Sequence, residues 1–105
     1  MQTTDWPKKI GEILFKRSVL IIYQSIYKNG RPAIFLEEDG LPFATLSVNL
    51  PEHPLKEGEF FVKNWFENQE IAPYVLEYTG LFEDTEIAVD TGHVKAPIWR
   101  FKKEE

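Results

Sequence analysis

The residues best suited to chemistry are Asp90, Thr91 and Gly92, which follow the apolar residues 87–89. An Asp-Thr-Gly triplet after a strand supplies a catalytic carboxylate when two copies meet across a dimer and share one proton. Such a half-site needs further strands and a flap after the triplet, and only thirteen residues follow Gly92. We therefore interpret the triplet as a tight turn.

The other candidate bases and ligands lie far apart along the chain. His53 stands between prolines and His93 follows a turn glycine, and neither has a second histidine at a metal-ligand spacing. The acidic run Glu37, Glu38 and Asp39 lacks the spacing of a calcium loop. The chain has no cysteine, no glycine-rich phosphate loop and no nucleophile elbow. We predict no catalytic residue, no metal site and no cofactor, with an enzyme of unrecognised type as an alternative.

The net charge of −5 is unevenly distributed. Residues 32–94 hold thirteen acidic side chains against Lys56 and Lys63, a local net charge of −11, whereas residues 1–31 and 95–105 carry +4 and +2. Phosphate attraction needs a basic surface, so nucleic acid is a disfavoured partner. An alternative hypothesis is that the acidic side chains line one face and imitate nucleic acid, which would inhibit a host defence or nucleic-acid enzyme.

The length of 105 residues and a hydrophobic content of 43% predict a single folded domain, residues 1–105. The longest strictly apolar run, Val19–Tyr23, is shorter than a membrane span or the core of an export signal. We therefore expect no membrane association and a cytoplasmic location.

Two turn pairs divide the first half into three strands. Asn29–Gly30 and Asp39–Gly40 separate the β-prone runs Val19–Tyr27, Pro32–Glu38 and Phe43–Leu50. With two-residue loops, Tyr27 faces Pro32 and Leu36 faces Phe43. This register predicts a core face and a mixed, aromatic second face. The core face holds Ile22, Ile26, Ala33, Phe35, Ala44, Leu46 and Val48, and the second holds Tyr23, Ser25, Tyr27, Ile34, Leu36, Phe43, Thr45 and Ser47.

The second half predicts a strand, a helix and a final hairpin. Glu59–Asn64 forms the strand, Asn68 caps a helix that runs to Thr79 and ends at Gly80, and Leu81–Val89 pairs with Val94–Phe101. We expect residues 1–11 to be a partly ordered arm and residues 102–105 to fray. The fold class is α+β, an antiparallel β-meander of three to four strands packed by one short helix, with a C-terminal strand or hairpin.

Several motifs occur in a characteristic order: Asn29–Ala33, then ATLSVNLP at residues 44–51, then residues 83–85, then TGHVKAPIWRF at residues 91–101. In this order, residues 29–101 resemble a family of small bacterial proteins of unknown function that are often encoded on plasmids and other mobile elements. The resemblance implies an accessory role but supplies no catalytic or ligand residue. Similar sequences have Pro where this chain has Asp90, and Gly near Glu86.

A chain without a catalytic constellation but with a mixed aromatic face is predicted to bind another macromolecule, most simply a protein. The candidate interface comprises Tyr23, Tyr27, Phe43, Glu37, Glu38 and Asp39, whereas Trp65 and Trp99 are assigned to the core. A further alternative is single-stranded nucleic acid bound by Tyr23 and Tyr27, with Arg17, Lys28 and Arg31 nearby. The sequence does not set an oligomeric state.

Overall fold

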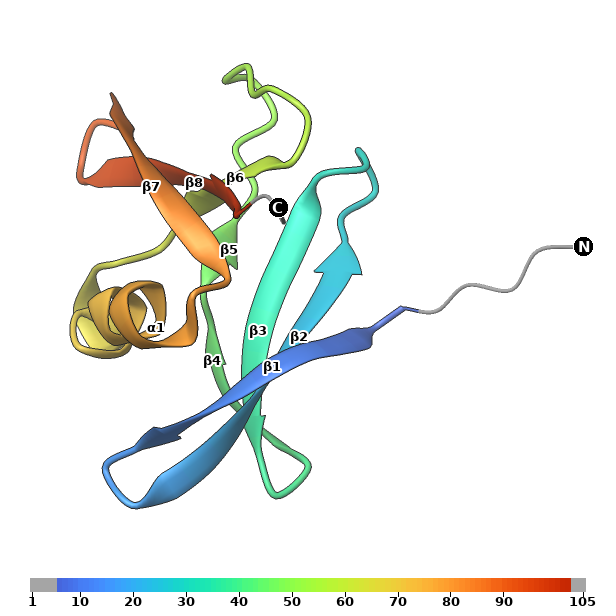
Figure 1. The fold of residues 1–105 in the computed structure, drawn as a ribbon. Coiled ribbons are helices and arrows are strands. Elements are labelled where there is room, and N and C mark those ends of the chain that lie inside the picture. The colour runs from blue at the N-terminus through green and yellow to red at the C-terminus, as the bar shows by residue number, and fades with distance from the viewer. Residues whose placement is uncertain (1–5, 103–105) are drawn as a thin grey trace, which may run out of the picture.

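Two antiparallel sheets of four strands, joined by one continuous segment of chain, form the body of the protein (Figure 1). The computed structural model describes residues 6–102. The first sheet has the order β1 (Lys8–Phe15), β2 (Ser18–Ile26), β3 (Pro32–Glu38) and β4 (Leu41–Thr45). The second has the order β5 (Ser47–Val48), β6 (Glu59–Val62), β8 (Lys95–Phe101) and β7 (Phe82–Asp90). The short helices η1 (Phe66–Asn68) and α1 (Ile71–Thr79) lie between β6 and β7, so the predicted α+β class with a β-meander is confirmed.

Strand β1 was not predicted, because residues 1–11 were assigned to an arm. Residues 1–5 lie outside the described residues, but Lys8–Gly11 belong to β1, which pairs with β2 through the two-residue turn Lys16–Arg17. Both turn residues have positive φ, 48° and 71°, as a type I′ turn requires, although Asn and Gly are the usual residues there. The sequence therefore carries no visible signal for this hairpin. At the other end, the Lys102 N–H donates to Leu81 O at 2.9 Å, and residues 103–105 lie outside the described residues.

The β2–β3 register differs from the prediction by one residue. Ile26, not Tyr27, faces Pro32, because the loop contains three residues, Lys28 to Gly30. The Gly30 N–H donates to Tyr27 O and the Tyr27 N–H donates to Arg31 O, both at 2.8 Å, and Gly30 has φ +87°. This is a turn followed by a glycine bulge, the usual form of a three-residue hairpin loop. Side chains alternate along a strand, so the slip exchanges the two faces of β3.

The β3–β4 hairpin has the predicted two-residue turn but contains an additional bulge. Glu38 faces Leu41 across Asp39–Gly40, whereas Leu36 faces Ala44 instead of Phe43 because the register shifts between Leu36 and Glu37. The predicted assignment of side chains to the two faces is therefore correct for some residues and wrong for others. Ile22 and Leu46 are buried core residues, as predicted. Ile34 and Leu36 are also buried, although they were predicted on the second face. Of the residues predicted for the core face, Ile26 is exposed, and Ala33 and Phe35 lie on the outer face of the sheet.

The main core fills the space between the two sheets and α1. Its buried members come from both sheets and from the helix: Ile13, Leu20, Ile22, Ile34, Leu36, Leu46, Phe60, Val62, Ile71, Ala72, Val75, Phe82 and Trp99. Trp99 is thus a core residue as predicted, while Trp65 is half-buried against a smaller cluster of Phe61, Ala96 and Ile98. Helix α1 contacts both β1 and β7, the outer strands of the two sheets, so it lies along the gap between them (Figure 1).

The helix boundaries show one correction. Gly80 ends α1 in the left-handed conformation, φ +70°, as predicted. Asn68 does not cap it, because Glu70 occupies the N-cap position and Asn68 lies in η1. The Asn68 side chain is fully buried and donates from Nδ2 to Thr45 O at 2.7 Å and to Lys63 O at 2.9 Å. It therefore fastens the segment before α1 to the ends of β4 and β6.

Candidate functional site

The two tyrosines of the predicted interface have different roles. The Tyr23 ring stacks on Phe35, its neighbour across the strands, with centroids 5.5 Å apart and planes at 19°, on the outer face of the first sheet. The Tyr27 and Ser47 hydroxyls share a hydrogen bond of 2.8 Å, and Ser47 Oγ also accepts from the Ile34 N–H at 2.8 Å. Tyr27 thus joins the end of β2 to Ser47 of β5, where the chain passes from one sheet to the other. Of the pair, only Tyr23 lies on the outer face.

Glu37, Glu38, Asp39 and Phe43 lie at or near the β3–β4 turn. Glu37 and Glu38 are half-buried, whereas Asp39 is exposed at the tip. Phe43 is 41% exposed, and its ring meets the ring of Phe15 edge-on, with centroids 6.4 Å apart. Phe43 therefore pairs with β1, which the sequence had not revealed, and not with Tyr23 and Tyr27.

Phe43 and Phe15 begin a connected series of four aromatic side chains, which we call the aromatic ladder: Phe43, Phe15, Tyr74 and Tyr78. Phe15 meets Tyr74 with centroids 5.0 Å apart, and Tyr74 meets Tyr78 at 4.7 Å. Tyr74 and Tyr78 are four residues apart on α1, which places them on one side of the helix. The ladder thus runs from β4 past β1 to α1, and its end residues are the most exposed, Tyr78 at 63%.

An open hollow of about 550 Å³ lies beside the ladder, between the β1–β2 turn and the start of α1. Its lining comprises Phe15, Lys16, Gln69, Glu70, Pro73 and Tyr74. The Tyr74 hydroxyl donates to Leu14 O at 3.1 Å, which fixes this ring against β1. Lys16 Nζ lies 5.4 Å from the centroid of the Phe15 ring and forms an ion pair with Glu70. The hollow therefore combines aromatic walls with one cation and one carboxylate.

Sequence reasoning missed most of this site. Phe15 and Lys16 belong to the unpredicted hairpin, and Tyr74 and Tyr78 were not among the predicted interface residues. In the structure Ile71 and Val75 are buried but Tyr78 is not. The spacing of Tyr74 and Tyr78 was the available signal, because an i, i+4 aromatic pair lies on one side of a helix.

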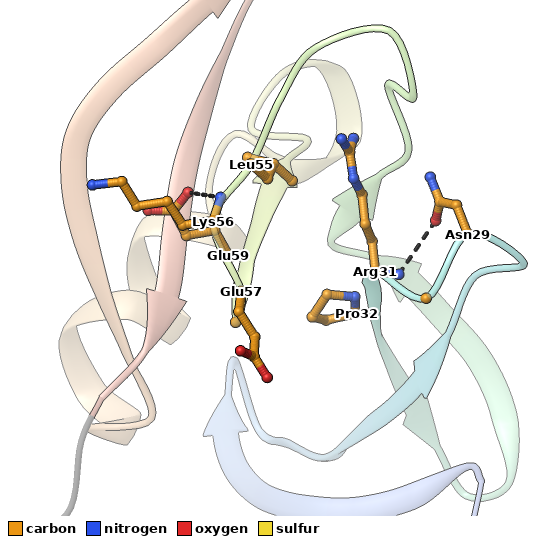
Figure 2. A pocket seen from close by; sticks show the side chains of 9 residues that line it. Asn29, Arg31, Pro32, Leu55, Lys56, Glu57 and Glu59 are labelled. Atoms are coloured by element: carbon orange, nitrogen blue, oxygen red, sulfur yellow. Dashed lines mark hydrogen bonds between the residues drawn. The ribbon is translucent and has the colours of Figure 1, made fainter.

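A second hollow, of about 260 Å³, lies between the β2–β3 turn and the β5–β6 loop (Figure 2). The Arg31 guanidinium extends toward that loop and donates to Leu50 O at 2.8 Å and to His53 O at 2.6 Å. Glu59 Oε1 accepts from the Lys56 N–H at 2.8 Å. These polar groups are already engaged in hydrogen bonds within the protein. The hollow is therefore best explained as the junction at which Arg31 holds the β5–β6 loop. Arg31 was one of the bases assigned to the single-stranded nucleic-acid alternative, but its guanidinium is already engaged in these two hydrogen bonds.

The residues considered for catalysis do not converge. Asp90 Oδ1 accepts from the Gly92 N–H at 2.8 Å, so the Asp-Thr-Gly triplet forms the tight turn between β7 and β8, next to the exposed His93. An enzyme of unrecognised type would need further polar groups close to Asp90, such as Arg100. Arg100 lies five residues along β8 from Lys95, the partner of Asp90, or about 16 Å away at the rise of a strand. Within residues 6–102, no three His, Cys, Asp or Glu residues are grouped so as to hold a metal ion.

The described acidic residues come from several separate parts of the fold. They lie in β1, at the β3–β4 turn, in the β5–β6 loop and the start of β6, near α1 and along β7, and Figure 1 shows the β3–β4 turn and the β5–β6 loop at opposite ends of the molecule. Four of them are paired with a base: Glu12 with Lys9, Glu70 with Lys16, Glu67 with Lys63, and Glu83 with Arg100. A phosphate mimic needs ordered charge on one face, and this layout does not supply it.

Comparison with protein-family models, curated proteins and solved structures gives no significant match. In the part of the chain that the structure describes, no helix is long and apolar enough to cross a membrane.

Proposed function

We propose that this protein is a non-catalytic binding module that takes up an extended segment of another protein on the aromatic ladder. The observation that carries the proposal is the continuity of four aromatic rings, from Phe43 to Tyr78, beside an open hollow of about 550 Å³. Ligand sites are commonly hollows of about 300–1,000 Å³ with apolar walls and a few polar groups. Exposed aromatic side chains also concentrate binding energy at protein interfaces.

The ladder is a better candidate than the outer face of the first sheet, where Tyr23 of the predicted interface lies. Tyr23 and Phe35 stack on each other, so each ring already buries one side. Phe15 and Tyr74 instead line a hollow that has room for a ligand, and Tyr74 is held in place by its bond to Leu14 O. A preorganised aromatic site loses little side-chain entropy when it binds.

The proposal is tested by selecting peptides from a random display library on the full chain and measuring the affinity of the enriched peptides by fluorescence anisotropy. Tyr78→Ala should weaken binding at least tenfold, because an exposed anchoring ring is lost without damage to the core. Tyr23→Ala is the matched control and should change the affinity less than twofold. Enrichment of no peptide, or loss of binding only in the Tyr23 variant, would refute the ladder as the site.

We also propose a cytoplasmic accessory role on a mobile element, which is supported by the resemblance of residues 29–101. A partner captured from a bacterial host should be released by an excess of a ladder-binding peptide. Retention of the partner despite saturation with that peptide would argue against this role.

A further inference from the structure

We infer that the segment bound by the ladder is proline-containing and basic, and that one of its Lys or Arg side chains replaces Lys16 at Glu70. This inference rests on the proposed function and specifies the class of partner. It combines three features of the site: the spacing of the rings, the charge around them and the position of Lys16.

The spacing of the rings suits a polyproline II segment. Neighbouring ring centroids of the ladder are 4.7–6.4 Å apart. A polyproline II helix rises about 3.1 Å per residue, so two residues advance about 6 Å, which is close to one ring interval. Its backbone has no internal hydrogen bonds, and it is already extended before binding, so docking on aromatic rings orders it at low entropic cost.

The surroundings of the ladder are mainly acidic. Residues 64–94, which include all of α1, contain no Lys or Arg, and Glu70 and Glu77 lie at the start and near the end of that helix. At the other end, the β3–β4 turn next to Phe43 carries Glu38 and Asp39. The bases nearby are Lys16 and Arg17 of the β1–β2 turn, and of these two only Lys16 forms an ion pair with a described residue. An incoming basic segment would complement this charge.

Lys16 shows where a cation fits. Its ammonium group lies over the Phe15 ring and against the Glu70 carboxylate, an arrangement that favours a cation through both the ring face and the charge. Both side chains of this ion pair are largely exposed, so the pair is weak and the Lys16 side chain can leave. A partner cation at this position would exchange one ion pair for another and add the contacts of its own chain.

The test compares two variants that remove the same charge from the same turn. Lys16→Gln frees Glu70, whereas Arg17→Gln leaves the Lys16–Glu70 pair intact. For the peptides enriched on the full chain, we expect Lys16→Gln to raise the affinity about fivefold and Glu70→Gln to lower it by a similar factor, with little change for Arg17→Gln. The enriched sequences should carry proline together with Lys or Arg, and replacing their prolines by alanine should weaken binding.

Equal effects of Lys16→Gln and Arg17→Gln would overturn the inference, because general charge rather than the Glu70 position would then control binding. Enrichment of acidic or proline-free peptides that still depend on Tyr78 would also overturn it, while leaving the proposed function intact. Binding that is insensitive to Tyr78 would instead count against the proposed function. Circular dichroism of each variant establishes that the fold is retained.

Discussion

Replacement of Asn68 by alanine should destabilise the whole protein, because this side chain is the polar link between η1 and the ends of β4 and β6. Asn68 is fully buried and donates to Thr45 O and Lys63 O at 2.7 and 2.9 Å. The alanine variant loses both bonds and leaves two carbonyl groups without these donors. It also removes Asn68 Oδ1, which has no partner among the described residues, and this partly offsets the loss.

The magnitude follows from the two lost bonds. Each buried hydrogen bond contributes about 1 kcal/mol, and an acceptor left unsatisfied adds about 1–3 kcal/mol, so we expect a net loss of about 2–4 kcal/mol. At about 4–8 °C per kcal/mol for a domain near this size, Tm should fall by about 8–32 °C. Urea unfolding followed by circular dichroism measures the free energy, and a calorimetric scan measures Tm.

Asn64→Ala is the control, because Asn64 is exposed close by in the chain and should change stability by less than about 0.5 kcal/mol. Asn68→Asp sharpens the test. An ionised carboxylate has no donor for either carbonyl oxygen, so burial raises the pKa of the new carboxyl in the folded state. The part of its destabilisation that comes from ionisation should grow as the pH rises from the unfolded pKa of about 3.9 through the raised folded pKa. Below a pH of about 3.9 a smaller loss should remain, because the neutral carboxyl has one O–H donor for two carbonyl oxygens. A loss under about 1 kcal/mol for Asn68→Ala would refute the reasoning.

Three further predictions concern local structure. Glu86 lies in the β7 bulge with φ +67°, so Glu86→Gly should raise the free energy of unfolding by about 1 kcal/mol while Glu86→Ala should not; equal urea midpoints for the two variants would contradict this. The lysine of Arg31→Lys cannot form both hydrogen bonds of the guanidinium, to Leu50 O and to His53 O, so amide hydrogen exchange in the β5–β6 loop should accelerate several-fold. Unchanged protection of these amides would show that Arg31 does not hold the loop in place. The hydrogen bond from Lys63, together with a backbone hydrogen bond, lowers the pKa of Glu67. Lys63→Gln should therefore raise the Glu67 pKa toward its ordinary value, as measured by NMR titration. The same Glu67 pKa in both proteins would exclude Lys63 as the main cause.

The sequence already contained the local chemistry of most elements. β-branched and aromatic runs indicated β2, β3 and β6–β8 to within a few residues, because their side chains fit a pleated surface. Gly80 ended α1 and Asp39–Gly40 formed a two-residue turn, since both sites use positive φ, which glycine adopts without strain. The arrangement of these elements as a meander with one helix followed from the short connections.

Register could not be fixed by the same signals. Asn29–Gly30 marks a turn correctly, but a two-residue loop and a three-residue loop with a glycine bulge use the same pair. The choice was made by the packing of Ile34 and Leu36 against the second sheet, and it moved Phe35 to the outer face. The β1–β2 turn was invisible for the opposite reason, because Lys16 and Arg17 are residues that seldom occupy it.

The residues along the chain were enough to predict most of the secondary structure other than β1, the uneven charge and the absence of familiar catalytic motifs, because these depend on neighbouring residues. Only the tertiary structure brought Phe15 and Phe43 from two strands to Tyr74 and Tyr78 on the helix, and placed Lys16 beside Glu70. These contacts join residues that are far apart in sequence. They form because α1 packs along β1 in the gap between the two sheets, and no local pattern encodes that packing.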